Sequence, residues 1–519
     1  MNMKSFSLFG KLFLIASIAL LSACSDNDDD NGNGNGNNGG GDNGGDGSTE
    51  QILFNNGTQI GNGEQSFSIK ESHTIKKGTY VVKGWIYIED GATLTIEPGT
   101  IIKGDKATKA TLIAKRGGKL IAKGTVSEPI VFTSNQAQGS RKPGDWGGII
   151  LSGRAHNNND NTTGMPIEGG PIAPHGGSDD NDNSGILSYV RVEFAGIPFE
   201  TDQEINGVTF GSVGRGTQVD HVQVSYSGDD SFEWFGGTVN AKYLVAYHGW
   251  DDDFDTDYGF SGNLQFLLSV RNPKIADQSL SNGFESDNNA NGTTDEPYTK
   301  AVFSNVTFIG PIGQATDFAN TTQYITGDGL ISPDGGRLGT FQSAVQIRRN
   351  SRLNLFNSIA TGYPVGLILD NQKGTTQKWA EEGIIKIKNN IFAGMTVLGA
   401  DINKQAPAWT DQLSTNGTTV TDATKPSFSS SFFNLASNNN KALTSIADLK
   451  LKQPNSKAAN PNYGPVAGSP ALGLGAFTDA LLSDSFFTKV NYSGAFASDS
   501  DADNWMSGWT NFDPQNTSY

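Results

Sequence analysis

A Phe followed by an acidic residue recurs three times in the middle of the chain, each time at the end of a strand-like run. The pairs are Phe232-Glu233, Phe254-Asp255 and Phe284-Glu285. They are spaced 22 and then 30 residues apart, which is the length of one structural repeat in a solenoid. Equivalent residues of stacked repeats lie one above another. The recurrence therefore predicts a parallel β-helix with the acids in a ladder on one face.

Short runs of β-branched residues, separated by Gly, Pro and Asp, extend this pattern over residues 51–400. Examples are YVVKGWIYI at 80–88, PIVFT at 129–133 and IIKIKNNI at 384–391. The first of these regions shows no helical periodicity of comparable length. An antiparallel β-sandwich is the alternative, but it would need evenly spaced hairpins. The uneven strands favour an all-β parallel solenoid.

Some phrases also resemble a known family. ATLTIEPGT at 92–100 is similar to the first coils of pectin-lyase-like β-helices, and ATLIAKRGGKL at 110–120 shares its frame. Asn-Val-Thr-Phe at 305–308 and Asn-Asn-Ile-Phe at 389–392 resemble rungs of the same fold. The resemblance implies a right-handed parallel β-helix. We expect lateral loops, notably at 156–184 and 310–340.

The first 23 residues have the properties of a lipoprotein signal peptide. Lys4 and Lys11 give a positive start, and the apolar run at 12–21 is too short to span a bilayer. Leu21-Ser22-Ala23-Cys24 resembles a bacterial lipobox, and Cys24 is the only Cys among 519 residues. An ordinary secretory signal is the alternative. We expect lipidation at Cys24.

Residues 24–50 form an acidic tether that is rich in Gly, Asn and Asp. Such a composition cannot bury enough apolar surface to fold. The run Ser25-Asp26-Asn27-Asp28-Asp29-Asp30 resembles the surface-export signal of Bacteroidota lipoproteins, although it could simply begin an acidic linker. We therefore expect an outer-membrane protein that is lipid-anchored and faces the medium.

The rung pattern fades after residue 400, and residues 401–519 are expected to form an irregular C-terminal capping region. Aromatic residues at 505–512 are expected to pack on the last coils.

Acidic residues around the Phe-acid pairs are the first candidates for chemistry. Stacked coils lie about 4.8 Å apart, so their carboxylates can share a hard cation such as Ca²⁺, which takes oxygen ligands. The pattern is not an EF-hand, and a solvated acidic surface is the alternative. The predicted metal ligands are Asp229, Asp230, Glu233, Asp252, Asp253, Asp255, Asp257 and Glu285.

Aromatic residues near these acids are candidates for stacking on a sugar ring. The candidates are Trp234, Tyr247, Trp250 and Tyr258. Packing in the interior is the alternative, and it is preferred for the three Phe residues because they recur in register.

Paired carboxylates also suit glycoside hydrolysis, and a lyase would need a basic side chain nearby. Possible bases are Arg215, Arg271, Lys274, Arg348 and His248. No lyase or polygalacturonase signature surrounds them. The five histidines have no zinc-site spacing.

The charge argues against nucleic acid as a partner. The formal net charge is −17, and removal of residues 1–23 with their two lysines takes it to −19. The mature chain resembles Bacteroidota outer-membrane lipoproteins with pectin-lyase-like β-helices. That resemblance implies a non-catalytic surface protein that binds a ligand such as a glycan and works with a TonB-dependent transporter. A polysaccharide lyase or glycoside hydrolase, and an adhesin or structural surface protein, are the alternatives.

Overall fold

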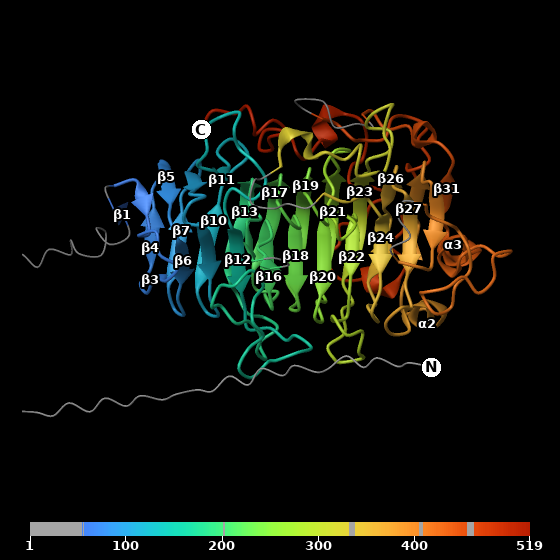
Figure 1. Ribbon diagram of the computed structural model, residues 1–519, viewed down its shortest axis with the longest axis horizontal. Coiled ribbons are helices and arrows are strands. Elements are labelled where there is room, and N and C mark those ends of the chain that lie inside the picture. Colours follow the sequence, from blue (N-terminus) through green and yellow to red (C-terminus); the bar gives the residue numbers. More distant parts are fainter. Residues whose placement is uncertain (1–53, 56, 201–202, 332–337, 404–407, 454–460) are drawn as a thin grey trace, which may run out of the picture. The chain divides into compact units, whose positions relative to one another are not determined.

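A computed structural model describes residues 54–55, 57–200, 203–331, 338–403, 408–453 and 461–519 (Figure 1). Within these residues, strands follow one another around successive coils and pair with the coil before and the coil after. The short helices of the described residues are α2 (Thr376–Glu381), α3 (Phe428–Phe433), η1 (Gly327–Gly329), η2 (Ala436–Asn438), η3 (Ile446–Leu449), η4 (Ala480–Leu482) and η5 (Asp501–Asp503).

One face of the coils is an eleven-stranded sheet, which we call sheet B. All of its pairings are parallel. Its strands, in spatial order, are β3 (Phe67–Ile69), β6 (Trp85–Ile88), β9 (Thr111–Ala114), β12 (Gly148–Ser152), β16 (Val208–Gly211), β18 (Phe232–Phe235), β20 (Phe254–Asp257), β22 (Phe284–Ser286), β24 (Ser343–Ile347), β27 (Val365–Leu369) and β30 (Val397–Ala400).

The remaining faces belong to an eighteen-stranded sheet, which we call sheet A. Its only antiparallel pairing among the described residues joins β1 to β2. Its strands are β1 (Phe54–Asn55), β2 (Gln59–Ile60), β4 (His73–Ile75), β5 (Thr79–Val82), β7 (Thr93–Ile96), β8 (Ile101–Gly104), β10 (Lys119–Lys123), β11 (Ile130–Ser134), β13 (Gly185–Glu193), β17 (Gln218–Ser225), β19 (Ala241–Tyr247), β21 (Asn263–Val270), β23 (Val302–Ile309), β25 (Asn354–Phe356), β26 (Ile359–Thr361), β28 (Ile387–Lys388), β29 (Ile391–Ala393) and β31 (Lys441–Leu443). A separate hairpin pairs β14 (Pro198–Glu200) with β15 (Gln203–Glu204).

The long strands of sheet A bend where one residue adopts a positive φ. In β13, β17 and β19 these residues are Tyr189, His221 and Tyr243, with φ of 51°, 50° and 58°. Such backbone is unfavourable for bulky residues, so stacking must support it. The rings do stack, with centroids 4.3 Å apart for Tyr189 and His221 and 4.5 Å apart for His221 and Tyr243. Each bend turns the chain onto a new face of the coil.

The interior is filled by one large apolar cluster that runs through all the coils. Sheet B contributes alternate residues to it, such as Ile149 and Leu151 from β12 or Val345 and Ile347 from β24. These observations confirm the predicted all-β parallel β-helix, and the antiparallel sandwich is excluded because the pairings between coils are parallel.

The lateral loop, residues 156–184, folds over the outer face of sheet B at its first coils. Ile167 and Ala173 of this loop are buried against Ile113 and Ile150, which point outward from β9 and β12. The loop therefore gives the first coils a second, external layer of apolar packing.

The C-terminal region contains two different structures. Helix α3 lies against β30 and β27 and closes the last coils, with Phe433 stacked on Phe392 at 4.5 Å. Residues 461–519, which we call the C-terminal segment, instead run back along the side of sheet A (Figure 1). Lys103 of β8 donates a hydrogen bond of 2.8 Å to the Tyr519 carbonyl oxygen.

The prediction that the aromatics at 505–512 pack on the last coils is therefore wrong. Trp509 lies edge-on to Tyr189 at 5.9 Å, Trp505 contacts Tyr243 at 5.3 Å, and Phe512 meets Tyr247 at 5.0 Å. These partners belong to β13 and β19 in the middle of the β-helix. The aromatics cover the side of the stacked bends because those bends expose ring faces.

Candidate functional site

The three acids that follow the recurrent Phe residues lie in one row on the outer face of sheet B. Glu233 of β18 is in register with Asp255 of β20, and Asp255 is in register with Glu285 of β22. We call these three residues the acidic row. The ladder predicted from the repeat is thus present, and stacking of parallel strands is its direct cause.

The preceding Phe residues form a matching row on the inner face, the phenylalanine row. Phe232, Phe254 and Phe284 are fully buried. Their ring centroids are 5.7 Å and 5.5 Å apart along the row. Because side chains alternate along a strand, a buried Phe places the next residue outside. This confirms that the Phe residues belong to the interior stack.

The acidic row is part of a longer outer row whose ends are apolar. Before the acids, the same register position holds Ile113, Ile150 and then Thr209. After them it holds Gln346, then Ile368 and Ala400. The isoleucines at both ends lie under covering segments, the lateral loop at one end and the region of Trp409 at the other. Acids therefore occupy the row only where no covering segment seals it with apolar side chains.

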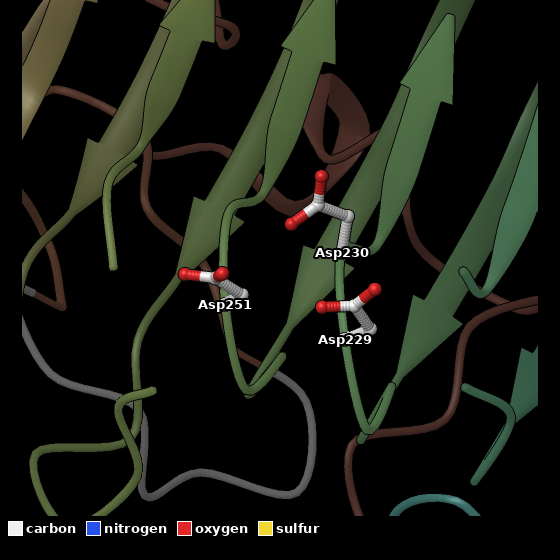
Figure 2. A group of neighbouring side chains, drawn as sticks. All are labelled: Asp229, Asp230 and Asp251. Atoms are coloured by element: carbon white, nitrogen blue, oxygen red, sulfur yellow. The ribbon is translucent and has the colours of Figure 1, made fainter. Parts of the chain in front are cut away.

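Further acids precede these strands in the turns. Asp229 and Asp230 lead into β18, and Asp251 and Asp252 lead into β20; Figure 2 shows Asp229, Asp230 and Asp251 at these turns. Together with the acidic row they form three groups in which oxygen atoms lie within 4.8 Å of one another. The groups are Asp229, Asp230 and Asp251; Asp230, Glu233 and Asp255; and Asp252, Asp255 and Glu285.

The crowding of these carboxylates shifts their protonation. Burial, and then neighbouring carboxylates, raise the pKa of Asp230, Glu233 and Asp255 well above the usual values. Burial and Asp277 raise the pKa of Asp251 to about 8. Either protons or a cation can relieve such repulsion. The groups can therefore hold a metal ion, as their composition predicts, because hard cations prefer carboxylate oxygens.

Amide donors tie the acids to one another. Asn206 donates to Glu233, and the Asn282 backbone N–H donates to Asp252 at 2.5 Å. The Asp252 backbone N–H in turn donates to Asp230 at 2.8 Å. Asn206 and Asn282 each lie two residues before the strand residue that is equivalent to Phe232. Both therefore occupy the repeat position of Asp230, but as amides they did not belong to the predicted set of acids.

One acid reaches the site from the lateral loop. Glu168 is hydrogen-bonded to Glu233 and Asn206, and the surrounding protein together with Glu204 raises its pKa to about 7. Two carboxyl groups can share a hydrogen bond only if one carries a proton. No local pattern around Glu168 indicates this contact, because the loop brings it from another coil.

Two arginines border the row on the side of β24. Arg348 forms ion pairs with Glu285 and, at 2.9 Å, with Asp287, and Arg349 pairs with Asp287 at 2.5 Å. Burial alone would lower the pKa of Arg348, but these carboxylates hold it well above its usual value. A basic group is thus within reach of the acidic row, although it stays protonated.

The other possible bases are engaged elsewhere. Arg271 is buried, and Lys274 lies over the Tyr324 ring at 3.1 Å. His248 is bonded to the Tyr226 hydroxyl at 3.2 Å, and burial together with Arg271 lowers its pKa to about 3. The Arg215 side chain is exposed, and its charge helps to lower the pKa of Asp180 in the lateral loop. None of these contacts leads to the acidic row.

Asp253 is not a member of the cation site, so that prediction is wrong. It is fully buried and forms an ion pair of 2.9 Å with Arg271, which is also fully buried. Ser269 donates to its second oxygen at 2.5 Å. Asp253 therefore neutralises a buried guanidinium. Asp257 lies on the outer face two residues after Asp255, but it belongs to none of the three groups that bring described acids together.

Three of the four aromatic candidates cannot stack on a ligand, because they are buried. Trp234 is in the central core, 5.3 Å from the ring of Phe210. Tyr247 is covered by Phe512 of the C-terminal segment, and Trp250 is 2% exposed. Tyr258 remains partly exposed, and burial followed by Asp257 raises its pKa to about 12. Of the four candidates, Tyr258 alone lies beside the acids with a partly exposed ring.

Cys24 and the tether lie outside the described residues, so lipidation stays a prediction. Among the described residues, no helix is both long enough and apolar enough to cross a bilayer.

Comparison with known proteins identifies one family. The model of the pectate-lyase-like β-helix domain matches residues 67–432, which is more than half of the chain. No curated protein and no solved structure matches the chain.

Proposed function

The chain belongs to the family of pectate-lyase-like β-helix domains, and we propose that it is a non-catalytic surface lipoprotein that binds an extracellular glycan through Ca²⁺ at the acidic row. The single observation that carries this proposal is the placement of Glu233, Asp255 and Glu285 in register on an outer face. At both ends of the same row, where other segments cover it, the equivalent positions hold apolar residues such as Ile150 and Ile368. Asp255 and Glu285 of the row are partly exposed, whereas Glu233 is buried, so a ligand would reach the row through Asp255 and Glu285.

Ca²⁺ is the cation that suits the site best. It takes six to eight oxygen ligands at about 2.3–2.6 Å, often from carboxylates and carbonyls in irregular geometry. Asp230 belongs to the first and second groups and Asp255 to the second and third, so the three groups offer a continuous set of oxygens. A bound divalent cation would supply the charge that otherwise has to come from protons.

The glycan is proposed because a Ca²⁺ ion on this face would keep some ligand positions open. Sugar hydroxyl and carboxylate oxygens can complete the coordination, and the Tyr258 ring can pack on the apolar side of a sugar.

Binding is favoured over catalysis because of the state of the basic groups. A lyase needs a side chain that accepts a proton from the sugar, and a doubly paired arginine with a raised pKa does not do so. His248 is neutral, but it is buried and hydrogen-bonded to the Tyr226 hydroxyl, so it is not available to a sugar as a base.

The proposed place of action rests on the sequence motifs alone. The lipobox at Cys24 and the acidic tether would anchor the β-helix to the outer membrane with this face toward the medium. Capture of glycans at the surface would serve a TonB-dependent transporter, which is the proposed partner. Surface labelling and protease accessibility of intact cells, with Cys24→Ala as the control, test the location.

Glycan binding is tested on the purified mature chain. An array of neutral and acidic glycans is probed in Ca²⁺ and in EDTA, and the solution is assayed for released products. We expect binding that EDTA abolishes, no products, and loss of binding in Asp255→Asn. Absence of binding to every glycan would favour the adhesin alternative.

A second candidate function, glycoside hydrolysis, rests on Glu168. A carboxyl group with a pKa of about 7 beside Glu233 has the properties of a general acid. If glycan products are released and Glu168→Gln abolishes the release while binding persists, the chain is a hydrolase and the non-catalytic proposal fails.

A further inference from the structure

A cavity lies among the first coils and shares no residue with the acidic groups. Its volume is about 480 Å³, which is within the range of small-molecule sites. Its charged lining residues are Glu89, Asp90, Lys115, Arg116, Arg154 and Asp179. On a chain with a net charge of −17, a cavity with as many basic as acidic groups is locally positive relative to the rest of the surface.

The coil repeat explains how these charges meet. Glu89 and Asp90 directly follow β6, Lys115 and Arg116 follow β9, and Arg154 closely follows β12. Because the three strands are adjacent in sheet B, their turns stack. Residues 174–179 of the lateral loop form the opposite wall.

Two ion pairs join neighbouring turns of this wall. Lys115 pairs with Glu89 at 2.9 Å, and Arg154 pairs with Asp90 at 2.5 Å. Burial would raise the pKa of Glu89, but hydrogen bonds from Ser68 and Lys115 lower it below its usual value, so Glu89 stays ionised. Gly117 leaves room for the second pair, because a Cβ there would lie 1.9 Å from an Asp90 oxygen.

Arg116 differs from the other two cations. Its guanidinium donates to the carbonyl oxygens of Gly176 and Thr163, both at 3.0 Å. No acid of the described chain forms an ion pair with it within 4.0 Å. A guanidinium has five N–H groups, so donors and a full positive charge remain available. The two carbonyls fix its orientation in advance.

We propose that this cavity binds a small sugar acid, with its carboxylate on Arg116 and its hydroxyl groups on the ion-paired residues. A guanidinium recognises a carboxylate through two parallel hydrogen bonds. Lys115, Glu89, Arg154 and Asp90 provide donors and acceptors at set positions for hydroxyl groups. The volume suits one or two sugar rings. This site acts independently of Ca²⁺, since no acid of the acidic row takes part.

Isothermal titration of the mature chain tests the proposal with glucuronate as the probe, in EDTA, and with glucose and acetate as matched probes. We expect glucuronate to bind, and glucose and acetate to bind at least tenfold more weakly, because each lacks one of the recognised features. Arg116→Gln should weaken glucuronate binding roughly ten- to a hundredfold, which is the usual value of a charge-assisted hydrogen bond.

Two further variants make the result decisive. Ser178→Trp fills the cavity from the exposed loop without altering the guanidinium, so it should also abolish binding. Lys76→Gln removes the same charge from an exposed ion pair elsewhere and should bind normally. Thermal unfolding of each variant establishes that it is folded. Failure of the mature chain to bind glucuronate, or full affinity in folded Arg116→Gln and Ser178→Trp, would overturn the proposal.

The outcome is independent of the glycan site. If glucuronate binding persists in Asp255→Asn, the cavity stands even where the proposed function fails. If glucuronate binding is lost in Asp255→Asn or in EDTA, the sugar acid binds at the acidic row, and the cavity proposal is wrong.

Discussion

The phenylalanine row and the acidic row differ by one position along the same three strands, yet identical stacking has opposite energetic effects on them. Rings at 5.5–5.7 Å pack against one another and exclude water. Carboxylates brought together by the same register repel one another, and burial followed by this repulsion raises their pKa values. The backbone that stabilises the inner row therefore strains the outer one. The acidic row therefore does not serve stability by itself, and binding of a cation is the simplest explanation for it.

The inner row should show the largest effect on stability. Phe254→Ala removes a fully buried ring between two others and should cost about 3–5 kcal/mol of unfolding free energy. Denaturant-induced unfolding followed by fluorescence measures it. Phe486→Ala, at a partly exposed position of the C-terminal segment, is the matched control and should cost much less. A loss below about 1 kcal/mol in Phe254→Ala would contradict the inner stack.

The outer row should respond to Ca²⁺ instead. At a hundredfold excess over its Kd, a ligand stabilises the native state by about 2.7 kcal/mol. We expect Ca²⁺ to raise the Tm of the natural protein, and Asp255→Asn to lose this increase while remaining equally or more stable in EDTA, because one repelling charge is gone. Differential scanning calorimetry measures both.

Asp448→Asn, at an exposed position away from the row, should keep the Ca²⁺ response. A Ca²⁺ response that survives in Asp255→Asn would place the cation elsewhere.

The two rows should also differ in pH dependence. Carboxyl groups whose pKa is raised in the folded state bind protons more tightly there, so stability falls as pH rises through the folded pKa values. In EDTA we expect a decline from about pH 4 to about pH 8, since Glu168 has a pKa of about 7 and Asp251 of about 8. The decline should be on the order of 1–2 kcal/mol, because solvent screens the partly exposed acids.

Saturating Ca²⁺ should remove most of this decline, because the cation supplies the compensating charge. Thermal unfolding across this pH range, with and without Ca²⁺, measures both curves. Stability that rises with pH in EDTA would show that the acids are not under mutual repulsion.

The smallest effect concerns the accessible ring. Tyr258→Ala should weaken glycan binding by about 0.5–1.5 kcal/mol, which is the usual value of a stacking contact, without changing the Ca²⁺ response. Titration with the glycan found on the array measures it. Tyr80→Ala, a partly exposed tyrosine on β5, is the control. Equal losses in both variants would mean that Tyr258 has no specific contact with the ligand.

Some wrong assignments could have been avoided from the strand pattern. Trp234 lies two residues after Phe232 on one strand, so alternation places both on the same face. Once Phe232 is assigned to the interior, Trp234 follows it.

The wrong predictions for Tyr247 and Asp253 could not have been corrected from the local sequence. Tyr247 is covered by Phe512, which is more than 260 residues away along the chain. Asp253 is directed toward Arg271, which lies in the turn after the next strand of sheet A. In the turns before sheet B, simple alternation no longer applies, and the direction of a side chain depends on its partners.

The sequence by itself determined the coil period, the inner phenylalanine row and the register of Glu233, Asp255 and Glu285, because each depends only on strand alternation and repeat length. Tertiary structure alone decided which groups surround that row. Glu168, Asn206 and Arg348 reach it from a lateral loop or from other coils. Tertiary structure also decided that the C-terminal aromatics cover the bends of sheet A. Such contacts depend on the closure of long loops, and no local pattern in the chain encodes where those loops return.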